Sequence, residues 1–274
     1  MPHPGPIGLF DSGLGGLSVM REVRVLLPAE DLLYFADSAY CPYGNLAEEE
    51  IRARALAIAA FLRRQGAKAL VVACNTASVA ALETLRARYP DWPIIGMEPA
   101  VKPAVAATRN SRIGVLATTV TLHGERFAAL LRRYAQGVEV YSLPGRGLVE
   151  RVEAGQVDTP ETAAYLRELL SPLQAAQVDT LVLGSTHYSF LRPSIERAMG
   201  PAVAIIDSGA AVARQVRRVL EEQGLANPRQ EAGGESFYTS GDACEVGAVL
   251  ARLWGQPAVV QHCDSVLGRD TGDA

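Results

Sequence analysis

The sequence is poor in lysine, which limits the cofactor chemistry open to it. Only two lysines, Lys68 and Lys102, occur among its 274 residues. A pyridoxal-phosphate enzyme needs a lysine to form its Schiff base. Lys68 lies just before a predicted strand, at the end opposite to the one where ligands bind, and Lys102 directly precedes Pro103. The sequence therefore argues against pyridoxal phosphate.

An excess of positive charge and a long apolar run are also missing. The 26 basic and 30 acidic side chains give a net charge of −4, whereas a nucleic-acid partner calls for a basic face. No apolar run approaches the ~18 residues of a membrane span. The segment MPHPGPIGLF has no signal-peptide pattern. We predict a cytoplasmic protein that binds neither nucleic acid nor membranes.

Paired cysteines are absent as well. No CxxC pair or metal-ligand spacing joins the four cysteines, which are Cys41, Cys74, Cys244 and Cys263. A reducing compartment disfavours structural disulfides. We therefore expect four free thiols, at least one of them a candidate for chemistry, and no metal site.

The sequence does contain a regular alternation of short β-type runs and longer helical patterns. Predicted strands cover residues 7–10, 32–36, 70–73, 94–95, 113–117, 138–142, 181–183, 204–206 and 237–239. Predicted helices cover residues 16–27, 47–65, 78–89, 101–108, 122–134, 160–176, 191–199, 210–223 and 245–254. This alternation predicts an α/β protein, with parallel sheets covered by helices on both faces.

Two halves of the chain repeat each other. Residues 70–78 read LVVACNTAS and residues 181–189 read LVLGSTHYS; upstream, IGLFDSG at 7–13 matches IGVLATT at 113–119. Each apolar run followed by small polar residues is typical of a buried strand that opens into a loop and helix. Cys74 and Ser185 therefore occupy equivalent positions, a thiol in one half and a hydroxyl in the other.

Ligands of open parallel sheets bind at the carboxyl ends of the strands, where most of the notable polar residues fall. Cys74 is predicted at a helix N-terminus, and the macrodipole there should lower the thiol pKa from about 8.5 toward neutrality. The alternative is a buried cysteine that acts as a small apolar residue. Its position at a strand end among polar neighbours favours chemistry.

Three further groups follow predicted strands. Asp11 and Ser12 enter a glycine-rich turn that suits a carboxylate but matches neither the dinucleotide nor the P-loop fingerprint, and the alternative is a plain tight turn. His187 suits general acid/base catalysis, or else a structural hydrogen bond. The loop after Asp37, at 42–44, could close over a ligand or be an ordinary turn.

Seven motifs, in order along nearly the whole chain, resemble those of the glutamate racemase family of bacterial cell-wall synthesis. They are FDSGLGGLSV (10–19), PYG (42–44), ACNTAS (73–78), GMEPAVKPA (96–104), GSTHY (184–188), DSG (207–209) and FYTSGD (237–242). The resemblance implies two pseudo-symmetric α/β domains, 1–97 with 208–274 and 98–207, with the site in the cleft between them. It also implies a homodimer and cofactor-independent interconversion of L- and D-glutamate, which supplies D-glutamate for peptidoglycan.

The resemblance also implies roles for individual residues. Cys74 matches a catalytic thiol, with Ser185, Asp11 and His187 as the other catalytic candidates. The implied substrate-binding residues are Asp11, Ser12, Pro42, Tyr43, Gly44, Asn75, Thr76, Thr186 and His187. Asp37 and Glu150 match supporting carboxylates, although the stretch LPGRG at 143–147 departs from the family pattern before Glu150. Inversion of an α-carbon needs one acid/base group on each face of the substrate, which explains why the family has two catalytic thiols.

This chain departs from the family at its second thiol, where it has Ser185. A serine hydroxyl is a weak acid/base unless an adjacent base activates it, so we expect impaired racemisation. The serine is either a deliberate replacement or natural divergence, and the intact neighbours at 186–188 favour the first. Two other functions stay open: a one-base, decarboxylase-like relative, and a non-catalytic protein that binds glutamate.

Overall fold

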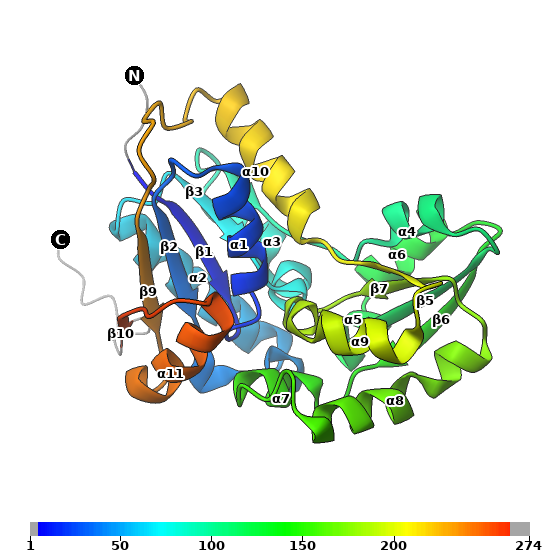
Figure 1. Ribbon diagram of the computed structural model, residues 1–274. Coiled ribbons are helices and arrows are strands. Elements are labelled where there is room, and N and C mark those ends of the chain that lie inside the picture. The colour runs from blue at the N-terminus through cyan, green and yellow to red at the C-terminus, as the bar shows by residue number, and fades with distance from the viewer. Residues whose placement is uncertain (1–4, 264–274) are drawn as a thin grey trace.

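The structure of the protein, a computed structural model, describes residues 5–263 and consists of two lobes, each built on a parallel β-sheet (Figure 1). The strands are β1 (Ile7–Asp11), β2 (Leu32–Ala36), β3 (Ala69–Val72), β4 (Ile94–Ile95), β5 (Arg112–Ala117), β6 (Glu139–Pro144), β7 (Thr180–Leu183), β8 (Ala204–Ile206), β9 (Glu235–Thr239) and β10 (Val260–His262). The larger sheet has the order β10-β9-β2-β1-β3-β4 and the smaller one β6-β5-β7-β8. Every pairing in both sheets is parallel.

Helices connect the strands and cover both faces of each sheet (Figure 1). The α-helices are α1 (Leu17–Leu26), α2 (Glu48–Arg64), α3 (Asn75–Arg88), α4 (Val101–Ala107), α5 (Thr119–His123), α6 (Glu125–Tyr134), α7 (Leu148–Glu153), α8 (Pro160–Ala175), α9 (Arg192–Met199), α10 (Gly209–Glu222) and α11 (Ala243–Trp254). The 3₁₀ helices are η1 (Ser38–Tyr40), η2 (Tyr43–Asn45) and η3 (Thr186–Leu191). The predicted fold class is confirmed.

The strands form where the sequence is apolar on both sides of the chain. β1, β2 and β3 are buried at every position, as parallel strands covered on two faces must be. Along β1, Phe10 packs into the core beneath α2 and α3, whereas Leu9 packs into the core on the opposite face. That second core continues without a break into the smaller lobe, where it includes Leu148 and Leu181. The two lobes are thus joined by one apolar core.

Several elements differ from the sequence-based expectation, among them β10 and α7. β10, a three-residue strand at the edge of the sheet, was not predicted because two of its residues, Gln261 and His262, are polar and exposed. α7 was not predicted because its six residues are too few to show a helical period. Gly147, in the left-handed region at φ 69°, turns the chain into α7. This short helix proves important because it carries a residue of the site.

The connections place a switch in strand order at the centre of each sheet. β1 pairs with both β2 and β3, and β5 pairs in the same way with β6 and β7. Ligands of open α/β sheets bind at the carboxyl side of such a switch point. Asp11 and Cys74 lie at the switch point of the larger sheet, and Thr118 and Ser185 at that of the smaller one.

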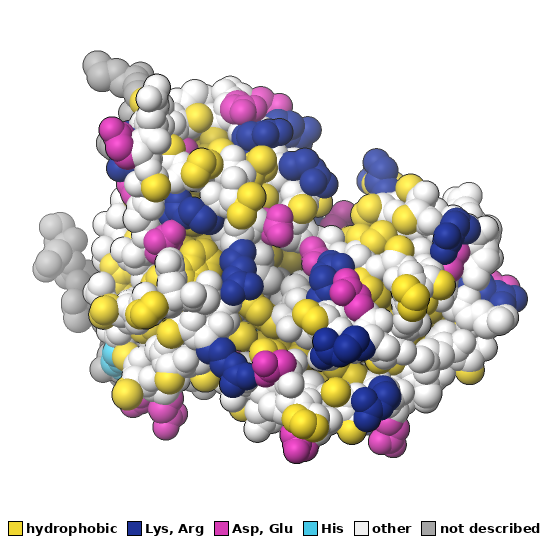
Figure 2. Space-filling view, viewed as in Figure 1, with side chains coloured by type: hydrophobic (Ala, Val, Ile, Leu, Met, Phe, Trp, Pro, Cys, Tyr) yellow, Lys and Arg dark blue, Asp and Glu magenta, His cyan; other side chains and the backbone are white. Residues whose placement is uncertain are grey.

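The surface of the molecule is of mixed charge. Figure 2 shows basic and acidic side chains interspersed over one face and a notch between the two lobes. No helix in residues 5–263 combines the length and the apolar character that a membrane crossing requires.

Candidate active site

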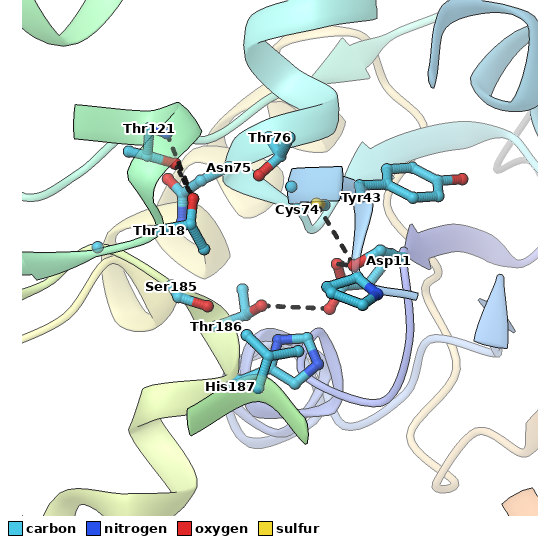
Figure 3. A pocket seen from close by; sticks show the side chains of 15 residues that line it. Asp11, Tyr43, Cys74, Asn75, Thr76, Thr118, Thr121, Ser185, Thr186 and His187 are labelled. Carbon is cyan, nitrogen blue, oxygen red and sulfur yellow. Dashed lines mark hydrogen bonds between the residues drawn. The ribbon is translucent and has the colours of Figure 1, made fainter. Parts of the chain in front are cut away.

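One narrow pocket, with a cavity volume of about 20 Å³, lies where the strand ends of the two sheets meet (Figure 3). Its lining residues are Asp11, Ser12, Pro42, Tyr43, Gly44, Cys74, Asn75, Thr76, Thr118, Thr121, Val149, Gly184, Ser185, Thr186 and His187. The pocket brings together each residue to which the sequence assigned catalysis or substrate binding. Cys74 and Ser185, from different lobes, open onto the same cavity.

Cys74 caps the N-terminus of α3. Its sulfur accepts a hydrogen bond from the Ala77 N–H at 3.4 Å and lies 3.9 Å from Ser12 Oγ. Burial and the negative charge of Asp11 nevertheless raise the pKa of the Cys74 thiol. The prediction that the helix would lower this pKa is wrong, because loss of hydration outweighs the cap in so closed a site. A thiolate here needs additional positive charge close by.

Asp11 ends β1 and is held by backbone amides. The Ser12 N–H donates to Oδ1 at 2.7 Å, and the Gly16 N–H donates to Oδ2 at 2.6 Å. The Thr186 hydroxyl, from the other lobe, donates to Oδ2 at 3.2 Å (Figure 3). Burial raises the pKa of Asp11, although the nearby His187 opposes the rise. Asp11 is therefore a fixed acidic group that faces both lobes.

His187 pairs with Glu153, the last residue of α7. The two side chains are 2.6 Å apart at Nε2 and Oε1, and Oε1 also accepts the Leu14 N–H at 2.7 Å. Burial alone would lower the pKa of His187, but the hydrogen bond and charge of Glu153 outweigh it and the pKa is raised. A Cβ on Gly15 would lie 2.3 Å from His187 Nδ1, so glycine is needed for this close approach.

Asn75 supplies polar atoms that have no protein partner. Its side chain is 4% exposed, and neither its oxygen nor its nitrogen makes a hydrogen bond within the described residues. Buried amides are normally satisfied, and Asn75 lines the pocket (Figure 3). The N–H groups of Asn75 and Thr76, the first two residues of α3, lack helical partners in the same place, whereas the Ala77 N–H is taken by Cys74. This end of the pocket therefore suits an anionic ligand group.

Asp37 lies behind the pocket rather than in its wall. It accepts hydrogen bonds from the Tyr43 hydroxyl at 2.5 Å and from Arg54 Nε at 2.8 Å. Ser240 Oγ donates to its other oxygen at 2.7 Å. Asp37 and Arg54 form an almost fully buried ion pair. Together they hold the loop that carries Pro42, Tyr43 and Gly44 to the pocket.

The comparison with known proteins agrees with this arrangement. Residues 7–216 match the family described as Asp/Glu/Hydantoin racemase. A glutamate racemase of Pseudomonas aeruginosa is 54% identical over 254 residues, which make up 93% of this chain and 96% of that protein. The chain belongs to the glutamate racemase family.

Solved structures of glutamate racemases share the fold over almost the whole chain. An isoform from Bacillus anthracis superposes with a TM-score of 0.86 at 32% identity, covering 95% of this chain and 97% of that one. The Escherichia coli glutamate racemase, solved with L-glutamate and the activator UDP-MurNAc-ala, gives a TM-score of 0.84 at 32% identity and covers 94% and 97%.

One contact in this member of the glutamate racemase family was not found from the sequence. Glu153 contacts His187, whereas Glu150, one turn earlier on α7, is exposed and makes no hydrogen bond to His187 in the described chain. The motif LVERVE offers two candidate carboxylates, and only the direction of a six-residue helix separates them. Thr118 and Thr121 also line the pocket, as expected from the sequence for polar residues after a strand end, and Thr118 follows β5 as Ser12 follows β1.

In the described part of this glutamate racemase fold, no base forms a hydrogen bond with the Ser185 hydroxyl. It is 8% exposed, it precedes η3, and its hydroxyl makes no capping hydrogen bond. His187 Nε2 is engaged with Glu153, and within residues 5–263 no hydrogen bond joins His187 to Ser185.

One group of described residues has the donor set of a metal site. Cys41, Glu153 and His187 each offer one ligand atom, and these atoms lie within 4.8 Å of one another.

Proposed function

We propose that this chain interconverts L- and D-glutamate by proton transfer on opposite faces of the α-carbon, and that Ser185 makes the reaction slow. The observation that carries the proposal is the presence of Cys74 and Ser185 at equivalent strand ends that open onto one pocket. Glutamate racemases that are 54% and 52% identical over most of the chain support glutamate as the substrate.

Substrate carboxylates would bind to neutral donors. No lysine or arginine of residues 5–263 lines the pocket. Anionic groups would therefore bind at the N-terminus of α3 and to Asn75, whose amide is buried without a partner in the described chain. Thr76, Thr186 and the backbone of the 42–44 loop complete the proposed set of substrate contacts. The carboxylate of Asp11 is the matching group for the substrate ammonium.

Proton transfer begins when the Cys74 sulfur removes the α-proton from one face of the substrate. The negative charge that develops is stabilised by fixed donors that already surround the carboxylate. Delivery of a proton from residue 185 to the opposite face completes inversion. The bound ammonium supplies the positive charge that the Cys74 thiolate needs, because burial and Asp11 otherwise raise its pKa.

Ser185 makes the second half of this exchange unfavourable. A hydroxyl is a far weaker acid/base than a thiol unless a base activates it. His187 is committed to Glu153 and supplies no such activation. We therefore expect proton exchange on the Cys74 face without efficient inversion.

Deuterium incorporation from solvent into L- and D-glutamate tests the proposal. The chain should exchange the α-proton of one enantiomer only, and Ser185→Cys should raise inversion by about 10²- to 10⁴-fold. Equal inversion rates in both proteins would refute the proposed role of position 185. No exchange by either protein, with glutamate binding retained in calorimetry, would replace the racemase with a glutamate-binding protein.

The biological setting is part of the same proposal. We place the reaction in the cytoplasm, with D-glutamate consumed in peptidoglycan synthesis, and the protein as a homodimer. The proposed units are residues 1–97 with 208–274, of which 264–274 lie outside the described residues, and residues 98–207.

A further inference from the structure

Three metal-ligating side chains from distant parts of the chain meet beside the pocket. Cys41 lies in the loop between η1 and η2, Glu153 ends α7, and His187 belongs to η3. Their sulfur, oxygen and nitrogen ligand atoms lie within 4.8 Å of one another. Cys41 comes from the lobe of the larger sheet and the other two residues from the lobe of the smaller one, so the cluster crosses the boundary between lobes.

The backbone leaves room for this cluster at Gly13. A Cβ at that position would lie 2.3 Å from Glu153 Oε1 and 2.9 Å from Cys41 Sγ. Either contact would force a side chain to shift, so glycine at this position lets the carboxylate and the thiol approach from the two lobes without displacement.

The charge and accessibility of the cluster also suit a cation. Asp11 and Glu150 add negative charge around His187. The Leu14 N–H orients Glu153 Oε1 at 2.7 Å, the kind of outer contact that fixes metal-ligating carboxylates. Cys41 is half-buried and the Glu153 side chain is 20% exposed. The cluster is therefore partly exposed at Cys41 and Glu153 and buried at His187.

We propose that Cys41, Glu153 and His187 bind one divalent cation of the zinc class, which ties the two lobes together. Thiolate, imidazole and carboxylate are the ligands that Zn²⁺ takes at about 2.0–2.3 Å, and three protein ligands plus one water is a common set. Binding releases the thiol proton of Cys41 and the proton shared between His187 and Glu153.

The required movements are small. Ligand atoms around a tetrahedral zinc lie roughly 3.4–3.6 Å apart, as follows from those bond lengths. The contact between His187 and Glu153, now 2.6 Å, therefore opens by somewhat less than ~1 Å. The distances from the Cys41 sulfur to the other two ligand atoms, at most 4.8 Å, shorten by up to about 1.3 Å. A movement of the loop that carries Cys41, or closure of the two lobes, brings the Cys41 sulfur this much closer.

The proposed binding of the cation is independent of the proposed function, but its effect on proton exchange rests on that function. His187 lines the pocket, and a cation on its Nε2 fixes the imidazole and the two lobes in one arrangement. The bound cation is therefore an inhibitor of proton exchange.

Cobalt(II) absorption and zinc calorimetry on the full chain test the site. One equivalent of Co²⁺ should give a thiolate-to-metal band that Cys41→Ser abolishes and that Cys74→Ser, Cys244→Ser and Cys263→Ser retain. Zinc affinity should fall by at least about 100-fold in Cys41→Ser, since even outer partners of a metal site are worth about 10- to 100-fold. A band that survives Cys41→Ser, or no binding at micromolar Zn²⁺, overturns the proposal.

Two further measurements distinguish a failure of the proposed zinc site from a failure of the proposed function. Glu153→Gln should weaken zinc binding while thermal unfolding shows that the variant remains folded; unchanged affinity would overturn the assignment of Glu153. Zinc inhibition is measured in Ser185→Cys. Zinc binding without any racemisation contradicts only the proposed function, whereas racemisation with no zinc binding contradicts only this inference.

Discussion

The two halves of the pocket, around Cys74 and around Ser185, have similar backbone conformations at these residues but differ in the chemistry of their side chains. Cys74 and Ser185 both precede a helix in extended conformation, with φ of −135° and −137°. Cys74 caps a 14-residue α-helix through its sulfur, whereas Ser185 precedes six residues of 3₁₀ helix and makes no capping bond. The repeated fold therefore preserves the position of the reacting atom, and the side chain decides whether that atom is useful.

The two halves also have different supports. On the Cys74 side, the 42–44 loop rests on the buried pair of Asp37 and Arg54. On the Ser185 side, His187 rests on Glu153. Substitutions that make the two halves of the pocket more alike, or that remove one of the two supports, therefore test this difference by measurement.

Cys74→Ser should have the largest effect because it leaves hydroxyls on both faces of the substrate. We expect proton exchange into glutamate to fall by about 10²- to 10⁴-fold. Deuterium incorporation measures the change. The matched control is Cys244→Ser, at an exposed cysteine outside the pocket. Exchange that survives in Cys74→Ser would assign the base to another residue.

Arg54→Met should have the next largest effect, on stability. Removing one partner of a buried ion pair costs about 3–5 kcal/mol, because the other charge is left without compensation. Chemical denaturation measures this loss, and the Tyr43 loop should loosen. Arg52→Met is the control: Arg52 pairs with Glu48 on the surface of the same helix, where such pairs are worth about 0.3–0.5 kcal/mol. Similar losses in both variants would contradict the prediction.

Glu153→Gln should have the smallest effect, on the pH dependence. The pKa of His187 is raised above 6.5, so its protonation stabilises the fold fully below pH 6.5, and this contribution is lost as the pH rises through the raised pKa. Glu153→Gln should lower the His187 pKa, as followed by NMR titration, and flatten the fall in stability above pH 6.5. Glu150→Gln is the control and should change both far less. A larger effect from Glu150→Gln would restore the sequence-based assignment.

The sequence predicts much of this protein because its signals are local. Buried parallel strands are continuous apolar runs, so β1, β3 and β7 were found to within one residue. The motifs at strand ends then led to Cys74, Asn75 and the other lining residues of the pocket. Short elements such as α7 were not predicted, because six residues are too few to show the helical period of apolar positions.

Electrostatics could not be predicted in this way. The N-terminal position of Cys74 suggests a lowered pKa, but burial and Asp11 reverse it. The choice between Glu150 and Glu153 depends on which face of α7 turns toward His187.

The sequence by itself determined the α/β fold, the internal repeat and the unequal pair Cys74 and Ser185, because each depends on neighbouring residues or on a pattern within a short segment. Only the tertiary structure decided that Cys41, Glu153 and His187 converge, since they are far apart in the chain and no spacing rule connects them. The physical reason is that packing of two sheets, rather than local preference, sets distances across the boundary between lobes and removes the water that governs their charges.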